Sequence, residues 1–120
     1  MPREYPRHQR IAAELMRSLS DILRFEIKDP GIAGVSLTNV DLSRDLSVAQ
    51  VYFSLLQPDG DPQPALDGLG RAAGFLRSKL GQAMKIRHVP ELRFRHDDSI
   101  AHADRIRRLI DAANRPNSEG

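Results

Sequence analysis

The apolar residues between Leu66 and Met84 recur at intervals of three and four positions. They stand at Leu66, Leu69, Ala73, Leu76, Leu80 and Met84. This spacing keeps one helical face apolar over about five turns. Gly74 falls in the middle, where a glycine costs about 1 kcal/mol relative to alanine. The sequence therefore predicts two helices, at about 64–73 and 75–86, joined by a kink at Ala72-Ala73-Gly74.

The charge of this part of the chain is strongly one-sided. Residues 71–96 hold seven basic residues and one acidic residue, for a local charge of +6, whereas residues 29–68 hold one basic and six acidic residues, for −5. The seven cations are Arg71, Arg77, Lys79, Lys85, Arg87, Arg93 and Arg95. The net charge of +2 thus conceals a polarised molecule. A local excess of this size attracts a polyanion, although a solvated helix face remains the alternative.

The first half of the chain predicts a helix followed by a hairpin. After a loose arm at 1–7, helical spacing extends from about His8 to Ile27, and Asp29-Pro30-Gly31 ends the helix. The segments 35–42 and 47–56 are typical of two antiparallel strands. The second is the more continuously apolar, which predicts a central position in the sheet.

The second half predicts one more strand and a short last helix. Residues 91–96 follow the helical segment, and a right-handed crossover would place this strand parallel to the second one. Asp97-Asp98-Ser99 is typical of a helix N-cap, and a short helix follows at about 100–110, before a frayed end at 115–120. A chain of 120 residues fits one domain over 1–120, with an ordered core at about 7–111.

Several classes of protein are disfavoured by what the sequence lacks. It contains no cysteine, which excludes disulfides and thiolate metal sites. No apolar run approaches 18 residues, so a soluble cytoplasmic protein is expected. The phosphate-loop and nucleophile-elbow motifs are absent. His96, Asp97, Asp98 and His102 cluster in sequence, but two histidines beside helix-capping carboxylates are more often structural. We therefore expect no enzyme activity, no metal and no cofactor.

Four stretches together resemble the ribosome-binding factor A family. They are the helix end 26–30, the hairpin 40–54, the kink 72–77 and the segment 85–94 that leads to Asp97-Asp98-Ser99. The resemblance covers about 7–109 and implies an α+β fold of the type II KH-like kind. It implies the order α-β-β-α-kink-α-β, a three-stranded mixed sheet and a short C-terminal helix. In this family an Ala-x-Gly kink replaces the usual Gly-x-x-Gly loop, and Ala72-Ala73-Gly74 matches it.

The resemblance also implies a function. Family members bind free 30S ribosomal subunits near the 5′-terminal helix of 16S rRNA, and they assist late subunit maturation and 16S rRNA processing. They are linked to growth in the cold, and a cytoplasmic monomer is expected. Family members often carry a longer charged tail than the one that stops here at Gly120. They also often have glycine where Ala103 stands in the last helix.

A KH-type site needs small residues for backbone approach, helix N-terminal amides and cations. We therefore predict that RNA is bound by Arg44, Arg71, Ala72, Ala73, Gly74, Arg77, Lys79, Lys85 and Arg87. The amides would come from a helix starting at Phe75. Two alternatives stay open: Gly74 could merely let the helix pass a neighbour, and Arg44 could be a solvated turn residue.

Most of the few aromatic residues fall on predicted apolar faces, where they would pack in the core. Base stacking on a sheet is therefore not expected, and recognition should depend on phosphates and RNA shape and weaken with salt. Two other functions stay open: a general RNA-binding KH module, and a protein-binding adaptor that acts through the first helix. The alternating charges on that helix, from Arg10 to Arg24, favour internal pairs over a specific interface.

Overall fold

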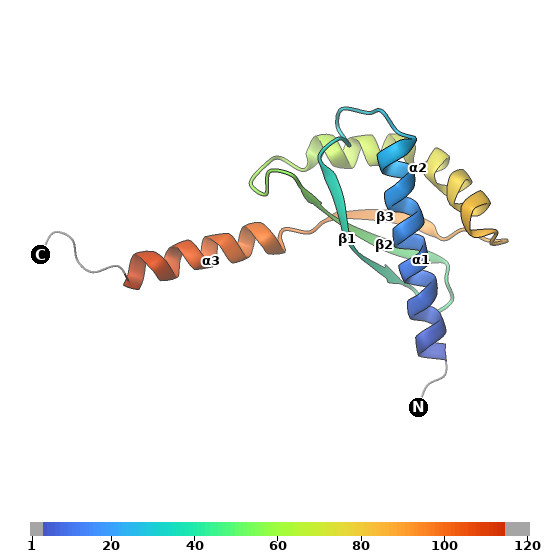
Figure 1. Ribbon diagram of the computed structural model, residues 1–120, viewed down its shortest axis with the longest axis horizontal. Helices are drawn as coiled ribbons and strands as arrows, with labels where there is room; N and C mark the ends of the chain where they lie inside the picture. Colours follow the sequence, from blue (N-terminus) through green and yellow to red (C-terminus); the bar gives the residue numbers. More distant parts are fainter. Residues whose placement is uncertain (1–3, 115–120) are drawn as a thin grey trace, which may run out of the picture.

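The computed structural model describes residues 4–114 of the chain (Figure 1). Its elements follow the order α1 (Glu4–Phe25), β1 (Val35–Leu42), β2 (Val48–Leu55), α2 (Gln63–Met84), β3 (Glu91–His96) and α3 (Ser99–Asn114). The predicted α+β class is confirmed, and so are the position and type of the three strands. Of the loose arm predicted at 1–7, residues 4–7 instead belong to α1, and residues 1–3 lie outside the described residues, as does the predicted frayed end at 115–120.

The sheet is mixed, with β2 in its centre. Its order is β1-β2-β3, and β1 pairs antiparallel to β2 with Val40 opposite Val51. On the other side β3 runs parallel to β2 and places Phe94 opposite the same Val51. Because β2 has partners on both edges, its inward side chains are fully enclosed. This confirms the central strand and the parallel crossover that were predicted.

The hydrophobic core lies between the sheet and the two long helices. Alternate β2 residues (Ala49, Val51 and Phe53) are completely buried, as period-two alternation requires. The helices add Leu15, Leu19, Leu69, Leu76 and Leu80, all likewise without exposed surface. No polar or charged residue among those described is buried. The apolar helical stripes identified in the sequence are therefore the faces that form the core.

The predicted division of the second helix is wrong. The backbone stays helical from Gln63 to Met84, so Gly74 interrupts nothing. What remains of the predicted kink is a bend, because the two halves of α2 run in different directions in Figure 1. Helices bend readily where glycines remove side-chain packing, and Gly70 and Gly74 lie mid-helix.

Both terminal helices exceed the lengths predicted for them. α1 begins at Glu4 instead of His8, because Pro6 is tolerated in a first helical turn, where its missing N–H has no partner to lose. α3 has 16 residues and extends away from the sheet (Figure 1), so it is not short. At its start Asp97 Oδ1 accepts a 3.0 Å hydrogen bond from the Ser99 amide, in the region where the N-cap was predicted.

Candidate nucleic-acid surface

The outward face of α2 is a strip of small residues. Gly70, Gly74 and Ser78 succeed one another at i, i+4 spacing, and all three are exposed. Apart from its chain neighbours and its own helix backbone, a Cβ added at Gly70 or at Gly74 would meet no atom of the described residues within 4 Å. The alternative that Gly74 lets the helix pass a neighbour is therefore wrong. Gly70 and Ser78 were not among the predicted residues, although their spacing from Gly74 is readable in the sequence.

Two other glycines of α2 do face close neighbours. A Cβ at Gly68 would lie 3.0 Å from Ile32 Cγ1, and one at Gly81 would lie 3.2 Å from Val89 Cγ2. These glycines allow α2 to pack against the α1–β1 linker and against the connection to β3. The four glycines of the helix thus divide into two that pack within the chain and two that leave the surface open.

Two of the predicted cations on α2 are already paired with the linker after α1. Arg71 Nη2 lies 2.9 Å from Asp29 Oδ2, and Lys79 Nζ lies 3.2 Å from Glu26 Oε1. The hydrogen bond from Arg71, together with one from the Gly31 amide, holds the pKa of Asp29 below its ordinary value. Both cations are thus held beside the small-residue strip by acids that a phosphate would have to displace.

Arg77 lies on the opposite flank of the strip and is tied to backbone. Its Nη2 donates to the Val89 carbonyl at 3.0 Å and its Nε donates to the Pro90 carbonyl at 3.3 Å. These bonds fasten α2 to the connection that leads into β3. The guanidinium has five donors and Arg77 is exposed, so capacity for a further acceptor remains.

Lys85 and Arg87 follow the end of α2 and are both exposed. Lys85 is the C-cap residue and adopts a left-handed conformation with φ 54°, which is unusual for a residue with a Cβ. Within residues 4–114, neither side chain forms an ion pair. Of the predicted cations on this part of the chain, these two are the most available to a ligand.

Arg44 stands apart, on the turn between β1 and β2. Asp45 Oδ1 accepts hydrogen bonds from the Ser47 hydroxyl at 2.6 Å and the Ser43 hydroxyl at 2.8 Å, and these bonds lower the pKa of Asp45. The turn lies beside α1, where His8 Nε2 is 3.2 Å from the Ser43 carbonyl oxygen. No hydrogen bond or ion pair among the described residues links Arg44 to α2. Its turn matches the solvated alternative, and its contact with RNA stays a prediction.

The predicted amide donors at Phe75 are not available. Because α2 is continuous, the Phe75 N–H lies in the helix interior, where amides bond to the carbonyl four residues earlier. Ala72 and Ala73 are half-buried, and Ala72 packs against the core. The surface therefore offers the small strip of Gly70, Gly74 and Ser78 and the surrounding cations, without a helix N-terminus.

The acid–histidine cluster has structural partners. Asp97 Oδ2 accepts a 2.8 Å hydrogen bond from Thr38, and bonds from Ser99 and Thr38 lower the pKa of Asp97. The His96 ring packs against Phe53 with centroids 5.6 Å apart. Among residues 4–114 no group of three ligating side chains could hold a metal ion.

Comparison with known proteins places these features in a family. The sequence profile of ribosome-binding factor A matches residues 7–110. A relative named ribosome-binding factor A from Natranaerobius thermophilus is 44% identical over 108 residues, which is 90% of this chain and 82% of that protein.

Solved structures agree with the sequence comparison. The crystal structure of ribosome-binding factor A from Thermus thermophilus has a TM-score of 0.67 at 28% identity, over 73% of this chain and 92% of that one. A homology model of the Thermus thermophilus factor, fitted into a cryo-EM map of a 30S–RbfA complex, has a TM-score of 0.60 at 30% identity. That match covers 70% of this chain and 88% of the other.

Proposed function

Because the chain belongs to the ribosome-binding factor A family, we propose that it binds free 30S ribosomal subunits and assists their late maturation. The observation that carries this proposal is the family match over residues 7–110, which spans every strand and the whole of α2. The homology model of the Thermus thermophilus factor, which was fitted into the map of a 30S–RbfA complex, supports the same partner.

The finer points of the proposal come from the family resemblance. The contact would be with 16S rRNA near its 5′-terminal helix, in the cytoplasm, by a monomer that supports rRNA processing and growth in the cold. The protein would act by binding, without catalysis or a cofactor. None of the described helices is both long and apolar enough to cross a membrane.

The outward face of α2 suits the sugar–phosphate backbone of RNA. At Gly70 and Gly74 no side chain rises above the helix, so a phosphate could approach the backbone closely. Lys85 and Arg87 would neutralise phosphates at one end of the strip. Arg71 and Lys79 would exchange their carboxylate partners for phosphates, so that each cation would still be paired with an anion. Such binding must weaken as salt rises, because neutralised phosphates release counterions.

The test compares two pairs of cations by co-sedimentation with free 30S subunits. Lys85→Ala with Arg87→Ala removes the two cations that follow the end of α2 and that form no ion pair among the described residues. Arg10→Ala with Arg17→Ala removes equal charge from the exposed face of α1. We expect only the Lys85→Ala, Arg87→Ala variant to bind 30S subunits less tightly. In that variant the slope of log binding constant against log salt concentration should become shallower by roughly 0.9 for each phosphate that is no longer neutralised. Equal reductions in the two pairs, with both variants folded, would show that only net charge matters.

The apolar face of α1 gives the adaptor function no support. Its apolar face, which includes Leu15, Leu19 and Ile22, is buried in the core, so the exposed side is the charged one. A general RNA-binding module would bind an unrelated structured RNA as tightly as it binds 30S subunits. Competition between 30S subunits and such an RNA separates that alternative from the proposal.

A further inference from the structure

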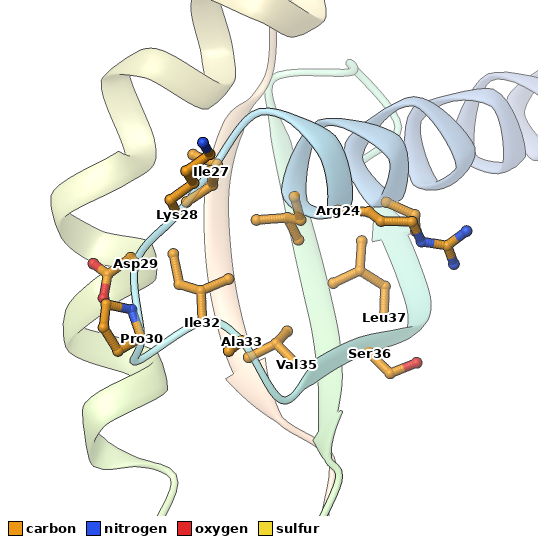
Figure 2. Close-up of a pocket in the computed structure, with 12 residues that line it drawn as sticks. Arg24, Ile27, Lys28, Asp29, Pro30, Ile32, Ala33, Val35, Ser36 and Leu37 are labelled. Atoms are coloured by element: carbon orange, nitrogen blue, oxygen red, sulfur yellow. The ribbon is translucent and has the colours of Figure 1, made fainter.

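A hollow of about 540 Å³ opens between the last turns of α1, the α1–β1 linker and the start of β1. Figure 2 shows the side chains around it. No residue of α2 lines it, and its one link to the cations of the small-residue strip is the lining residue Asp29, which pairs with Arg71 at 2.9 Å. The inference drawn from it is independent of the proposed function.

Apolar side chains form the floor of the hollow, whose lining as a whole is mixed polar and apolar. Leu23 and Ile32 are almost completely buried, with 9% and 4% of their surface exposed. Ile27, Val35 and Leu37 are half-buried along its walls. In Figure 2, Ile32 and Leu37 point into the space beneath α1. A floor formed in this way favours an apolar side chain.

The rim of the hollow is cationic. Arg24 and Lys28 are both exposed, and in Figure 2 their charged ends point away from the apolar interior. Asp29 is the one acidic residue of the lining, and it is held by Arg71 and by the Gly31 amide, both at 2.9 Å. The charge available to a ligand is therefore positive, which complements an acidic partner.

The hollow also borders the outer edge of β1, with which no other strand among the described residues pairs. β1 is an outer strand, and Gly34 accepts a 2.9 Å hydrogen bond from the Leu56 amide across the ladder. Because an antiparallel strand alternates its hydrogen-bonding direction, Val35 and Leu37 aim their backbone groups away from β2. The Val35 N–H donates a 2.9 Å hydrogen bond to the Ile32 carbonyl, so it is not available to a ligand. The same alternation directs the Val35 carbonyl and both backbone groups of Leu37 to the outer edge, and the regular ladder ends at Leu37, where the register with β2 shifts.

We propose that this edge binds an extended acidic peptide segment of a partner protein, as a fourth strand beside β1. Main-chain bonds to Val35 and Leu37 would align the segment. One apolar side chain would enter the hollow, and neighbouring carboxylates would meet Arg24 and Lys28. Strand addition combines backbone bonds for affinity with pockets for alternate side chains, and this edge offers both.

The probe is a capped pentapeptide, Glu-Val-Glu-Leu-Glu, compared with its lysine counterpart, Lys-Val-Lys-Leu-Lys. Each is titrated to millimolar concentration into the isotope-labelled full chain, and amide and methyl chemical shifts are followed by NMR. We expect the acidic peptide to perturb Leu23, Ile32 and residues 35–37, and the lysine peptide to bind more weakly. Arg24→Glu with Lys28→Glu should weaken the acidic peptide about fivefold to tenfold.

Arg10→Glu with Arg17→Glu is the control, because it makes the same charge change on the part of α1 away from the hollow. It should leave the affinity for the acidic peptide within about twofold of wild type. The proposal is overturned if the acidic peptide shifts no residue at 35–37, or if both peptides bind equally. It is also overturned if a uridine hexanucleotide perturbs these residues and the acidic peptide does not, since the site would then be one for RNA.

Discussion

Replacing glycine by alanine along α2 gives a direct test of the packing. At Gly74 a Cβ would enter open space, and the same holds at Gly70. The change therefore removes the helical penalty of glycine, about 0.8–1 kcal/mol, at no steric cost. For a chain of 120 residues this gain should raise the melting temperature by about 4 °C. Thermal unfolding followed by circular dichroism measures the shift for Gly70→Ala and Gly74→Ala.

Gly68→Ala is the matched change on the buried side of the same helix. Its Cβ would lie 3.0 Å from Ile32 Cγ1 and 3.3 Å from Asp29 Oδ2, so Ile32 and the linker must shift to admit it. We expect Gly68→Ala to be no more stable than the wild type, and so about 1 kcal/mol or more below Gly74→Ala. Equal stabilisation at Gly68 and Gly74, or a loss of stability at Gly74, would refute the assigned packing.

The same variants test the proposed surface through 30S binding. If a phosphate approaches α2 closely, the extra methyl group at Gly74 should weaken co-sedimentation although the protein itself is more stable. Gly74→Val, which also points into open space, should fold and should weaken binding further. A folded Gly74→Val that binds 30S subunits as tightly as the wild type would show that no backbone approach occurs there.

Three further predictions concern side chains with assigned contacts. Lys85→Gly should stabilise by about 1 kcal/mol, because glycine adopts φ 54° without strain, whereas Lys85→Ala should not; urea unfolding distinguishes them. Arg77→Gln should destabilise the protein by about 1 kcal/mol by removing two hydrogen bonds to the Val89 and Pro90 carbonyls, measurable in the same way. The lowered pKa of Asp29 contributes stability that is present above its unfolded pKa of about 4 and lost as pH falls through the lower folded value. When the pH falls below 4, the free energy of unfolding should therefore decrease less for Asp29→Asn than for the wild type.

The site was harder to predict than the fold, and Gly74 shows why. Its residue type indicated a place where a ligand could approach the helix backbone, and the structure leaves that position open, whereas the approach itself stays a prediction. Periodicity cannot tell a break from a bend, however, so the two predicted helices proved to be one. The predicted amide donors at Phe75 disappeared with the break. The cations were predicted as one group, but Arg44 stands apart from the others. The partner of Arg71, Asp29, lies 42 residues away and leaves no local signal.

The sequence by itself determined the elements whose signals are local. Alternating apolar residues specified the strands, and apolar residues at helical spacing specified the buried faces of α1 and α2. The reason is that the side chains on one face recur every second residue in a strand and every three to four residues in a helix, so a buried face leaves that period in the sequence. Tertiary structure alone decided which glycines of α2 are packed, which cations are already paired, and that β1 leaves a free edge beside an apolar hollow. Those properties depend on which distant segments come together, and no residue carries that information in its own neighbourhood.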